Sequence, residues 1–486
     1  MSVLSTTRVV DVIGNIPLRQ KLLFLCLFGF FIRLYVVVNA VTISNDSVTF
    51  LRMAESFSAG DYGAIFNIIR PPLYPLLTSF TSAVFGDMEL SSRVVSLVFG
   101  TLVIPVSCGI GKLIYNEKVG LIAALFAAIH PYMVRFSGEA LTEGLYYFLI
   151  GCIVYFGLKA VFEKKPALML VAGVLTAFAY LTKPGAIGFL IVVSLVAIVY
   201  DFKSLKHDWK RRLLFLFLAW AVFLALGLPY LYYLYSKTGG LAITGKFVAT
   251  VFSSKEIITI GGNFADLLSH FPESFSWVFV PFLIYGIIKR FKAGFTGREY
   301  SVFAILFAWW VVFYASTPSR KYMVQLMPVA IILPAVGYVY LSDYLKDRFR
   351  QRGLVIAALI LLLICAVQMT QGMVALHEHR YLERQAGLWI RENMEEGVAV
   401  VSRKQIMPFY GKARYVRMRQ VAYLRDVVIY ARMDGAGYIA GYPSKLSKKL
   451  GDFQKMEKKL LEEVKVFKSE DGRRYVIYRI LEEPRG

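Results

Sequence analysis

The sequence is poor in cysteine, and it contains neither an internal repeat nor a low-complexity segment. Its four cysteines all lie inside apolar stretches, at Cys26, Cys108, Cys152 and Cys365. Cysteines in such surroundings behave as small core residues, so a disulfide framework and a cysteine-based metal site are excluded. The apolar stretch at 22–40 is too long for a typical signal-peptide core, and no small-residue cleavage site follows it, so we expect a retained signal anchor.

Acidic residues are also scarce. The chain has 33 Asp and Glu against 55 Lys and Arg, a formal net charge of +22. In a soluble protein this excess would suggest nucleic acid. However, 57% of the residues are hydrophobic and the mean hydropathy is +0.56, whereas a soluble domain is typically about 45–50% apolar. We therefore expect a membrane protein with no nucleic-acid partner, whose basic residues follow the positive-inside rule and meet anionic lipid headgroups.

About eleven apolar stretches predict transmembrane helices, since a bilayer core needs roughly 20 apolar residues. Their approximate ranges are 20–41, 93–114, 119–134, 140–161, 167–182, 185–201, 213–235, 274–289, 301–316, 323–344 and 354–371. Two weaker apolar pieces lie between the first two spans, at 48–58 and 72–86. The second follows Pro71 and is typical of a re-entrant or interfacial helix.

Basic residues predict the orientation of these spans. The loops at 201–212, after 289 and after 345 are rich in Lys and Arg, and such loops remain in the cytoplasm. This predicts a multi-pass protein of the cell membrane with a cytoplasmic N-terminus. The membrane domain would cover 1–372 and include a first outer loop at 42–92. Residues 377–486 would form a small extracytoplasmic α/β domain.

Alternation and helical periodicity give the elements of that domain. Helices are expected at 381–394 and, with a break at Gly451, at 445–461. Strands are expected at 398–401, 438–442, 464–467 and 475–480.

The first outer loop contains an aspartate and an arginine that could do chemistry. Asp46 follows the first span directly, where partial desolvation would favour work as a general base; the alternative is that it caps the next short helix. Arg70 precedes Pro71-Pro72, so its guanidinium, which suits a phosphate, is displayed from a stiff turn. The alternative for Arg70 is an extended side chain that reaches lipid headgroups.

Other carboxylates and cations recur at the outer ends of later spans. Glu139 and Glu143 are four residues apart, which predicts a shared face of the span at 140–161. Glu143 lies inside an apolar run and needs a partner, which we expect to be Arg70 or Lys183. Lys183-Pro184 and Ser319-Arg320-Lys321-Tyr322 follow at later span ends. Ordinary interfacial lysine is the alternative for such positions, but together the residues are typical of a site for an anionic, membrane-embedded ligand.

These residues resemble the polyprenyl-phosphate-dependent glycosyltransferases of the GT-C superfamily, more narrowly the protein mannosyltransferase and lipid A aminoarabinose-transferase branch. The resemblance covers roughly 15–345, with a weaker likeness near Trp389-Ile390 and Phe409-Tyr410-Gly411. The motifs that carry it are Asp46 with Phe50, Ala54 and Gly60; Arg70-Pro71-Pro72-Leu73-Tyr74-Pro75; Phe85-Gly86 with Ser92-Arg93; Leu141-Thr142-Glu143; Leu181-Thr182-Lys183-Pro184; and Arg320-Lys321-Tyr322 before Pro328.

The resemblance implies a GT-C-like polytopic α-helical membrane protein with interfacial helices in the first outer loop. It implies transfer of a hexose or pentose from a polyprenyl-phosphate donor to a lipid, glycan or protein acceptor, with Asp46 as catalytic base. Arg70 matches the residue that helps to hold the donor phosphate. We expect Lys183, Arg320 and Tyr322 to bind the same phosphate, and Glu139, Glu143 and Tyr74 to support them.

The sequence departs from this family at one point. Many relatives have two adjacent acids at the first site, whereas Asn45 and Ser47 flank a lone Asp46. Mg²⁺ and Mn²⁺ favour several oxygen ligands, and one carboxylate supplies too few of them. We therefore expect no cofactor and no metal.

Two other classes of function remain open. Basic residues at helix ends would equally suit a transporter or flippase of a lipid-linked anion, although the repeats often found in transporters are absent and Arg33 is the main charged residue at mid-membrane depth. A receptor or scaffold built on the outer domain would leave the acids and bases of the outer loops unexplained.

Overall fold

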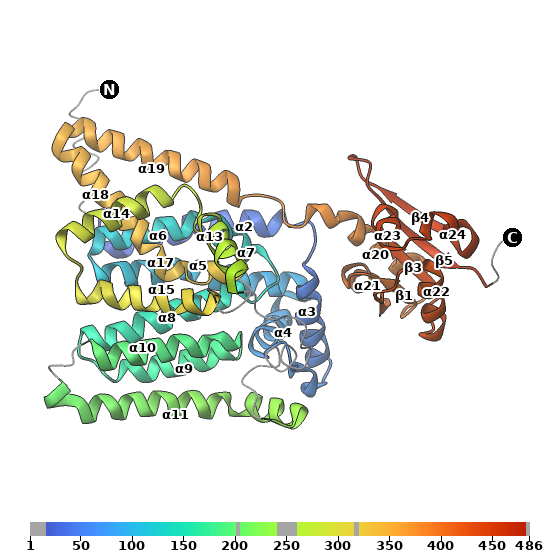
Figure 1. The fold of residues 1–486 in the computed structure, drawn as a ribbon, viewed down its shortest axis with the longest axis horizontal. Coiled ribbons are helices and arrows are strands. Elements are labelled where there is room, and N and C mark those ends of the chain that lie inside the picture. The colour runs from blue at the N-terminus through green and yellow to red at the C-terminus, as the bar shows by residue number, and fades with distance from the viewer. Residues whose placement is uncertain (1–15, 201–204, 241–259, 315–319, 483–486) are drawn as a thin grey trace. The chain divides into compact units, whose positions relative to one another are not determined.

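The computed structural model describes residues 16–200, 205–240, 260–314 and 320–482. Ser319 of the predicted site segment lies outside the described residues. The chain divides into two compact units, which are described separately (Figure 1). The first combines the chain up to Val38 with Phe50–Val374, and the second combines Asn39–Thr49 with Ala375–Gly486.

The first unit is helical. Its elements are α2 (Leu18–Val38), α3 (Asn45–Ser58, whose first turn lies in the second unit), η1 (Tyr62–Ile65), α4 (Leu73–Phe85), α5 (Met88–Ile114), α6 (Glu117–Ile129), α7 (Pro131–Gly138), α8 (Glu143–Phe162), α9 (Leu168–Tyr180), η2 (Pro184–Ala186), α10 (Ile187–Val199), α11 (Leu205–Thr238), α13 (Ile260–Phe275), α14 (Val280–Ala293), α15 (Gly297–Tyr314), α16 (Arg320–Val324), α17 (Met327–Ala330), α18 (Ile332–Phe349) and α19 (Gln351–Gly372). The helices α8, α9, α10 and α11 lie side by side (Figure 1).

Every apolar stretch expected to span the membrane falls, in its described part, on one of these helices or on two or three successive helices. Within the described residues, six helices are long and apolar enough to cross a membrane, or up to eight if each bent pair is one span. The number is lower than eleven by this measure in part because α9, with 13 residues, and the helical stretch Pro184–Val199 are apolar but short. The expected interfacial pieces at 48–58 and 72–86 form α3 and α4.

A buried arginine stabilises the break between α6 and α7, which meet at an angle of 53°. The Arg33 side chain is fully buried, and it donates to the carbonyl oxygens of Ala127 and Ala128 at 2.9 and 2.8 Å. These carbonyls belong to the last turn of α6, where backbone acceptors have no partner within the helix. A third bond reaches Ser137 Oγ in α7 at 3.2 Å. Arg33 is therefore explained by structure alone, as a clamp across a helix break.

A second buried charge closes the loop between α14 and α15. The Glu299 side chain is 1% exposed, and it accepts two bonds from the Arg290 guanidinium at 2.6 and 2.7 Å. The backbone N–H and the hydroxyl of Thr296 also donate to Glu299, at 2.7 and 2.8 Å. Arg298 lies over the ring of Phe162, so the C-terminal end of α8 is at this same end of the unit, called here the Arg290 end.

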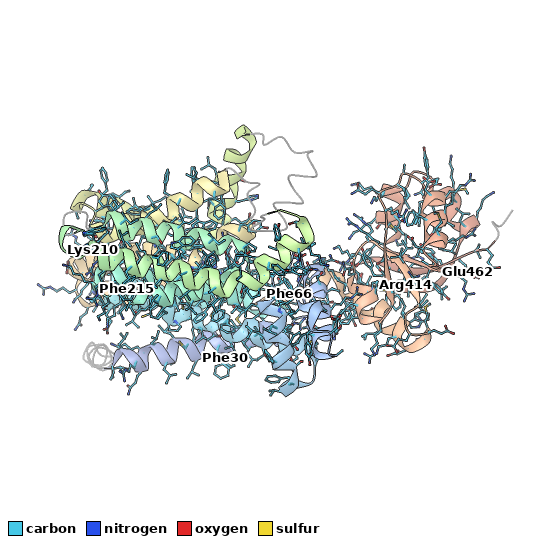
Figure 2. All side chains as sticks on the ribbon, turned by 90° about the horizontal axis from the view of Figure 1, so that it is seen from below. Phe30, Phe66, Lys210, Phe215, Arg414 and Glu462 are labelled. Carbon is cyan, nitrogen blue, oxygen red and sulfur yellow. The ribbon has the colours of Figure 1, made fainter. Side chains whose placement is uncertain are left out.

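The opposite end of the unit gathers the loop at 66–72, the α7–α8 turn and the α9–η2 turn; it is called the Lys183 end. Phe66 packs against Tyr233 near the C-terminal end of α11, with ring centroids 5.4 Å apart. Figure 2 shows Lys210 toward one end of α11 and Phe66 near the other. Lys210 and the Arg70 loop are thus at opposite ends of α11.

The second unit is a five-stranded sheet with strand order β2-β1-β3-β5-β4. The strands are β1 (Ala399–Ser402), β2 (Arg414–Arg417), β3 (Tyr438–Gly441), β4 (Leu461–Lys468) and β5 (Arg474–Ile480). The strands β2, β1 and β3 are parallel, and β5 pairs antiparallel with β3 and β4. The helices of the unit are η3 (Glu378–Arg380), α20 (Tyr381–Asn393), α21 (Ile406–Tyr410), α22 (Leu424–Met433), α23 (Pro443–Lys449) and α24 (Phe453–Leu460).

Apolar residues on both faces of the sheet form its core. Val400 packs with Leu382 of α20 on one face, whereas the next residue, Val401, packs with Val427 of α22 and Phe453 of α24 on the other, as the period of two along a strand requires. The four expected strands are confirmed as β1, β3, β4 and β5. The strand β2 was not expected. The basic segment at 445–461 forms α23 and α24, with the expected break at Gly451 between them.

The segment Asn39–Thr49 is fixed to the second unit by hydrogen bonds from several elements. The backbone N–H of Val41 donates to the carbonyl of Leu376 at 3.1 Å, and Arg384 of α20 donates to the carbonyl of Val41 at 2.7 Å. The backbone N–H of Gln405 donates to Asn45 Oδ1 at 2.8 Å. The residue before Asp46 is therefore anchored on the α/β unit.

Candidate functional site

The loop at 66–72 holds Arg70 in a rigid turn. Asn67 Oδ1 accepts hydrogen bonds from the backbone N–H groups of Ile69 and Arg70, at 2.9 and 3.0 Å. The Tyr230 hydroxyl of α11 donates to the Asn67 carbonyl at 2.9 Å. Pro71, which follows Arg70, is buried. The stiff turn expected from the prolines is present, and Asn67 and Tyr230 strengthen it.

Arg70 itself lies over an aromatic platform. Its guanidinium carbon is 5.2 Å from the centroid of the Phe50 ring in α3. The Phe50 ring meets the ring of Tyr74 edge to face, with centroids 5.5 Å apart. The Tyr74 hydroxyl is buried and donates to the carbonyl of Ser92 at 2.8 Å. The platform beneath Arg70 is therefore fixed to the first turns of α5.

The buried carboxylate at the start of α8 pairs with Lys183. The Glu143 side chain is fully buried, and its Oε1 lies 2.8 Å from Lys183 Nζ, which is 22% exposed. Lys183 Nζ also lies 5.3 Å from the centroid of the Tyr146 ring. A carboxylate in an apolar run needs such a partner, and Lys183 is one of the two partners expected from the sequence.

Hydrogen bonds join the Arg70 turn to the Glu143–Lys183 pair. The backbone N–H of Leu73 donates to the carbonyl of Leu181 at 2.9 Å, two residues before Lys183. Ser96 Oγ lies 2.9 Å from the Tyr74 hydroxyl and donates to the carbonyl of Leu141, also at 2.9 Å. The structure thus brings together three turns that are far apart in the sequence.

Two other expected residues, Tyr322 and Arg320, belong to α16. Tyr322 is partly exposed and interacts electrostatically with Tyr146, the residue beneath Lys183. Arg320 is the first residue of α16, but its side chain lies outside the described parts of the structure.

One expectation about Glu139 is wrong. The helix α8 begins at Glu143, and Glu139 follows the end of α7 with an extended backbone (φ −90°, ψ 148°). Glu139 and Glu143 therefore share no helix face, although both lie in or beside the α7–α8 turn. The cause is a bend at His130-Pro131, which makes α7 a separate helix and leaves four residues for the turn.

Asp46 lies in the first turn of α3. The alternative that Asp46 caps this helix is wrong, because Ser44 Oγ accepts the hydrogen bond from the backbone N–H of Ser47 at 3.1 Å. Asp46 belongs to the second unit and Arg70 to the first. That the two side chains face one another remains a prediction.

Residues 69–233 match the sequence model of the dolichyl-phosphate-mannose-protein mannosyltransferase family. This segment contains Arg70, Glu143 and Lys183. No curated protein sequence matches the chain.

Solved structures match nearly the whole chain. ArnT from Cupriavidus metallidurans, bound to undecaprenyl phosphate, is 14% identical with a TM-score of 0.65, over 96% of this chain and 98% of that protein. The oligosaccharyltransferase AglB from Archaeoglobus fulgidus, in complex with an inhibitory peptide and a dolichol-phosphate, is 13% identical with a TM-score of 0.65, over 94% of this chain and 74% of that protein. The chain has the GT-C fold.

The GT-C fold confirms the predicted resemblance and fold class: a multi-pass α-helical membrane protein with a small C-terminal α/β unit. Three residues of the candidate site were not predicted from the sequence: Asn67, Ser96 and Tyr146. Tyr146 could have been found, since it is three residues after Glu143 in a helix and so lies beside it. Ser96 gives no such signal, because its hydroxyl acts across 45 residues of chain.

The described residues contain no cluster of possible metal ligands. Within the parts of the chain that the structure describes, no three His, Cys, Asp or Glu side chains gather in a way that could hold a metal ion.

Proposed function

We propose that this protein is an integral-membrane glycosyltransferase that moves a sugar from a polyprenyl-phosphate donor to an acceptor on the extracytoplasmic side. The observation that carries the proposal is the cluster of Arg70 and the Glu143–Lys183 pair, held together at one end of the helices by buried hydrogen bonds. The structural neighbours with undecaprenyl phosphate and dolichol-phosphate support the choice of donor.

The two cations suit a phosphate that leaves with a lipid. A departing phosphate monoester needs charge stabilisation more than it needs a proton, and fixed cations supply it without reorganisation. Arg70 offers a fork of donors from a rigid turn, and Lys183 adds a compact positive charge from the turn that is hydrogen-bonded to it. Arg320 and Tyr322 are proposed to complete the site from α16. Glu143 orients Lys183, and Tyr74 holds the platform beneath Arg70.

Asp46 is proposed as the general base. The acceptor oxygen attacks the anomeric carbon, the bond from that carbon to the phosphate oxygen breaks, and Asp46 takes the acceptor's proton while polyprenyl phosphate leaves. A single displacement inverts the configuration. Asp46 and Phe50 are four residues apart in α3 and so share a helix face, and Arg70 covers Phe50. The proposal requires the base and the phosphate site to act on one substrate.

The sugar and the acceptor define the finer part of the proposal. A hexose or a pentose fits the same chemistry, because the anomeric carbon and the leaving phosphate are common to both. The acceptor is a lipid, a glycan or a protein hydroxyl. A mannosyltransferase and a lipid A-modifying enzyme are two branches within this range. The reaction is proposed to proceed with no metal, since Asp46 is flanked by Asn45 and Ser47.

The test is turnover by the purified full-length protein in detergent. A panel of polyprenyl-phosphate hexoses and pentoses is offered, and release of polyprenyl phosphate and inversion at the anomeric carbon are measured by mass spectrometry and NMR. The acceptor is identified by comparing cells with and without the active protein. It is the envelope glycan or lipid whose mass is lower by one sugar in the cells without it. Absence of release from every donor, in cells and in detergent, would refute the proposal.

A lipid-anion flippase is the second candidate, favoured by the two bent helix pairs, since broken helices are common in transporters. The break between α6 and α7 is closed by Arg33 and so offers no ion site there. A flippase would move a fluorescent polyprenyl-phosphate sugar across a liposome membrane with the sugar–phosphate bond intact. The transferase proposal requires that bond to break.

A further inference from the structure

A cavity of about 280 Å³ lies in the second unit. Its lining includes Arg403 and Lys404, which directly follow β1, and Tyr442 and Lys445, which follow β3. After β1 the chain forms β2 on one side of β1 and then β3 on its other side, so the strand order reverses at β1. Between β1 and β3, at their carboxyl ends, is the position where sheets of this kind bind ligands.

The cavity is strongly basic. Arg403, Lys404 and Lys445 line it, and Arg380 of η3 is close enough to interact electrostatically with Lys404. Burial lowers the pKa of Lys404, and the neighbouring Arg380 lowers it further. Glu383 is the one carboxylate among these lining residues. Four cations around one carboxylate leave an excess of positive charge that favours an anion.

Glu383 is a buried acceptor that points to a ligand. It extends from α20 and is 5% exposed. Tyr442 interacts with its carboxyl group, and within the described residues the Oε2 atom has no hydrogen-bond partner. Burial raises the pKa of this carboxyl group. A buried polar atom without a partner costs free energy, and a hydroxyl group in the cavity would satisfy it.

Two tyrosines give the cavity an aromatic wall. The rings of Tyr442 and Tyr475 pack edge to face, with centroids 4.9 Å apart. Lys445 Nζ lies 4.3 Å from the Tyr442 centroid, and both rings line the cavity. Aromatic faces accept the C–H faces of a sugar ring, whereas the cations require an oxyanion.

We propose that this cavity is a binding site for a phosphorylated saccharide, with the phosphate on Lys404, Lys445 and Arg403 and a sugar hydroxyl on Glu383. The volume is at the lower limit of small-molecule pockets, so it suits one sugar ring with one phosphate. None of the lining residues belongs to the Arg70 and Lys183 cluster, so the site is proposed in addition to that phosphate site.

Calorimetric titration of the full-length protein in detergent tests this, with mannose 1-phosphate as the probe and mannose, inorganic phosphate and adenosine monophosphate as comparisons. Mannose 1-phosphate should bind more tightly than phosphate, and mannose should give no heat. The double variant Lys404→Gln/Lys445→Gln should weaken binding about tenfold or more, since it removes two charge-assisted hydrogen bonds. The variant Glu383→Leu should lose the preference for mannose 1-phosphate over phosphate.

The matched control is Lys448→Gln/Lys449→Gln, which makes the same charge change in α23 at residues that do not line the cavity. Equal weakening by both double variants, or tighter binding of adenosine monophosphate, would overturn the proposal.

Hydrogen exchange on the unmodified protein gives the same test if a variant does not fold. Mannose 1-phosphate should protect peptides at 402–406 and 441–447. Protection confined to 66–74 and 181–186 would place the sugar phosphate at the transferase cluster and refute the separate site.

Discussion

Two buried glutamates of the first unit make ion pairs at opposite ends of the helices, and the two pairs differ in kind. Glu299 is held by both nitrogens of an arginine fork and by Thr296, and the same guanidinium also donates to the Gly294 carbonyl and the Tyr340 hydroxyl. Glu143 pairs with a lysine that rests against Tyr146 and is 22% exposed.

The difference shows how an ion pair that stabilises the fold can be distinguished from one that can bind a ligand. An arginine fork fixed by several acceptors in a rigid geometry has few donors left for a ligand. A lysine is a compact charge on a flexible stem and can shift toward an arriving anion. The Arg290 end therefore stabilises a loop, and the Lys183 end is the one that we assign to the substrate phosphate.

The largest expected effect is at Asp46, the base that we propose to act with the Lys183 end. Without this effect, the Lys183 end could not be assigned to catalysis. Asp46→Asn should lower kcat by about 10²–10⁴-fold, the usual contribution of a general base, with thermal unfolding and donor binding unchanged. The control is Asp61→Asn in the same outer segment, because asparagine keeps the cap that Asp61 gives to Ala64. Near-normal transfer by Asp46→Asn would remove Asp46 from the mechanism.

At the Arg290 end the expected effect is on stability alone. Arg290→Ala leaves Glu299 buried without its charge partner, which costs about 3–5 kcal/mol of unfolding free energy, while activity per folded molecule stays the same. Denaturation in detergent and kcat of the surviving fraction measure the two quantities. The exposed Lys292→Ala is the control. A lower kcat in the folded fraction of Arg290→Ala would contradict a purely structural role.

Lys183→Met should act on the donor. Loss of one charge-assisted hydrogen bond to phosphate is worth about 1.5–3 kcal/mol, so the donor KM should rise by about 10–100-fold with a smaller change in kcat. Lys159→Met is the matched control, since Lys159 is similarly exposed, at 28%, and lies near the other end of α8. If both variants changed the donor KM equally, the two ends would not differ as we infer.

The smallest effect is expected at Tyr74. Tyr74→Phe keeps the ring beneath Arg70 but loses the bond to the Ser92 carbonyl, a change of about 0.5–1.5 kcal/mol. The donor KM should rise no more than about tenfold, and exposed Tyr62→Phe should leave it unchanged. A rise as large as that of Lys183→Met would mean that the Tyr74 hydroxyl contacts the substrate itself.

The helices and most strands could be predicted because their signals are local. Long apolar runs predicted α2, α5 and α8, and short apolar runs predicted β1 and β5. The strand β2 gave no such signal, since Arg414 and Arg417 are exposed at the edge of the sheet and Val416 is its one buried residue. The bend between α6 and α7 falls at Pro131, inside an apolar stretch that was predicted as one span. Arg33, which binds the carbonyls freed at the bend, comes almost a hundred residues earlier in the chain.

The candidate site was predicted as residues but not as a network. Arg70, Glu143 and Lys183 each carry a signal, namely paired prolines or a charge inside or beside an apolar run. The pairing of Glu143 with Lys183 spans 40 residues, and the link from Leu73 to Leu181 is between backbone groups of two apolar residues. Contacts of this kind follow from packing, which no local pattern encodes.

Photolabelling tests the central claim most directly. A polyprenyl phosphate with a diazirine on the carbon next to the phosphate would be irradiated on the full-length protein, and the labelled peptides identified by mass spectrometry. The account predicts label in 66–74, 141–147 and 181–186, competed away by unlabelled polyprenyl phosphate and reduced in Lys183→Met. Competable label at 286–300, around Arg290 and Glu299, would contradict it.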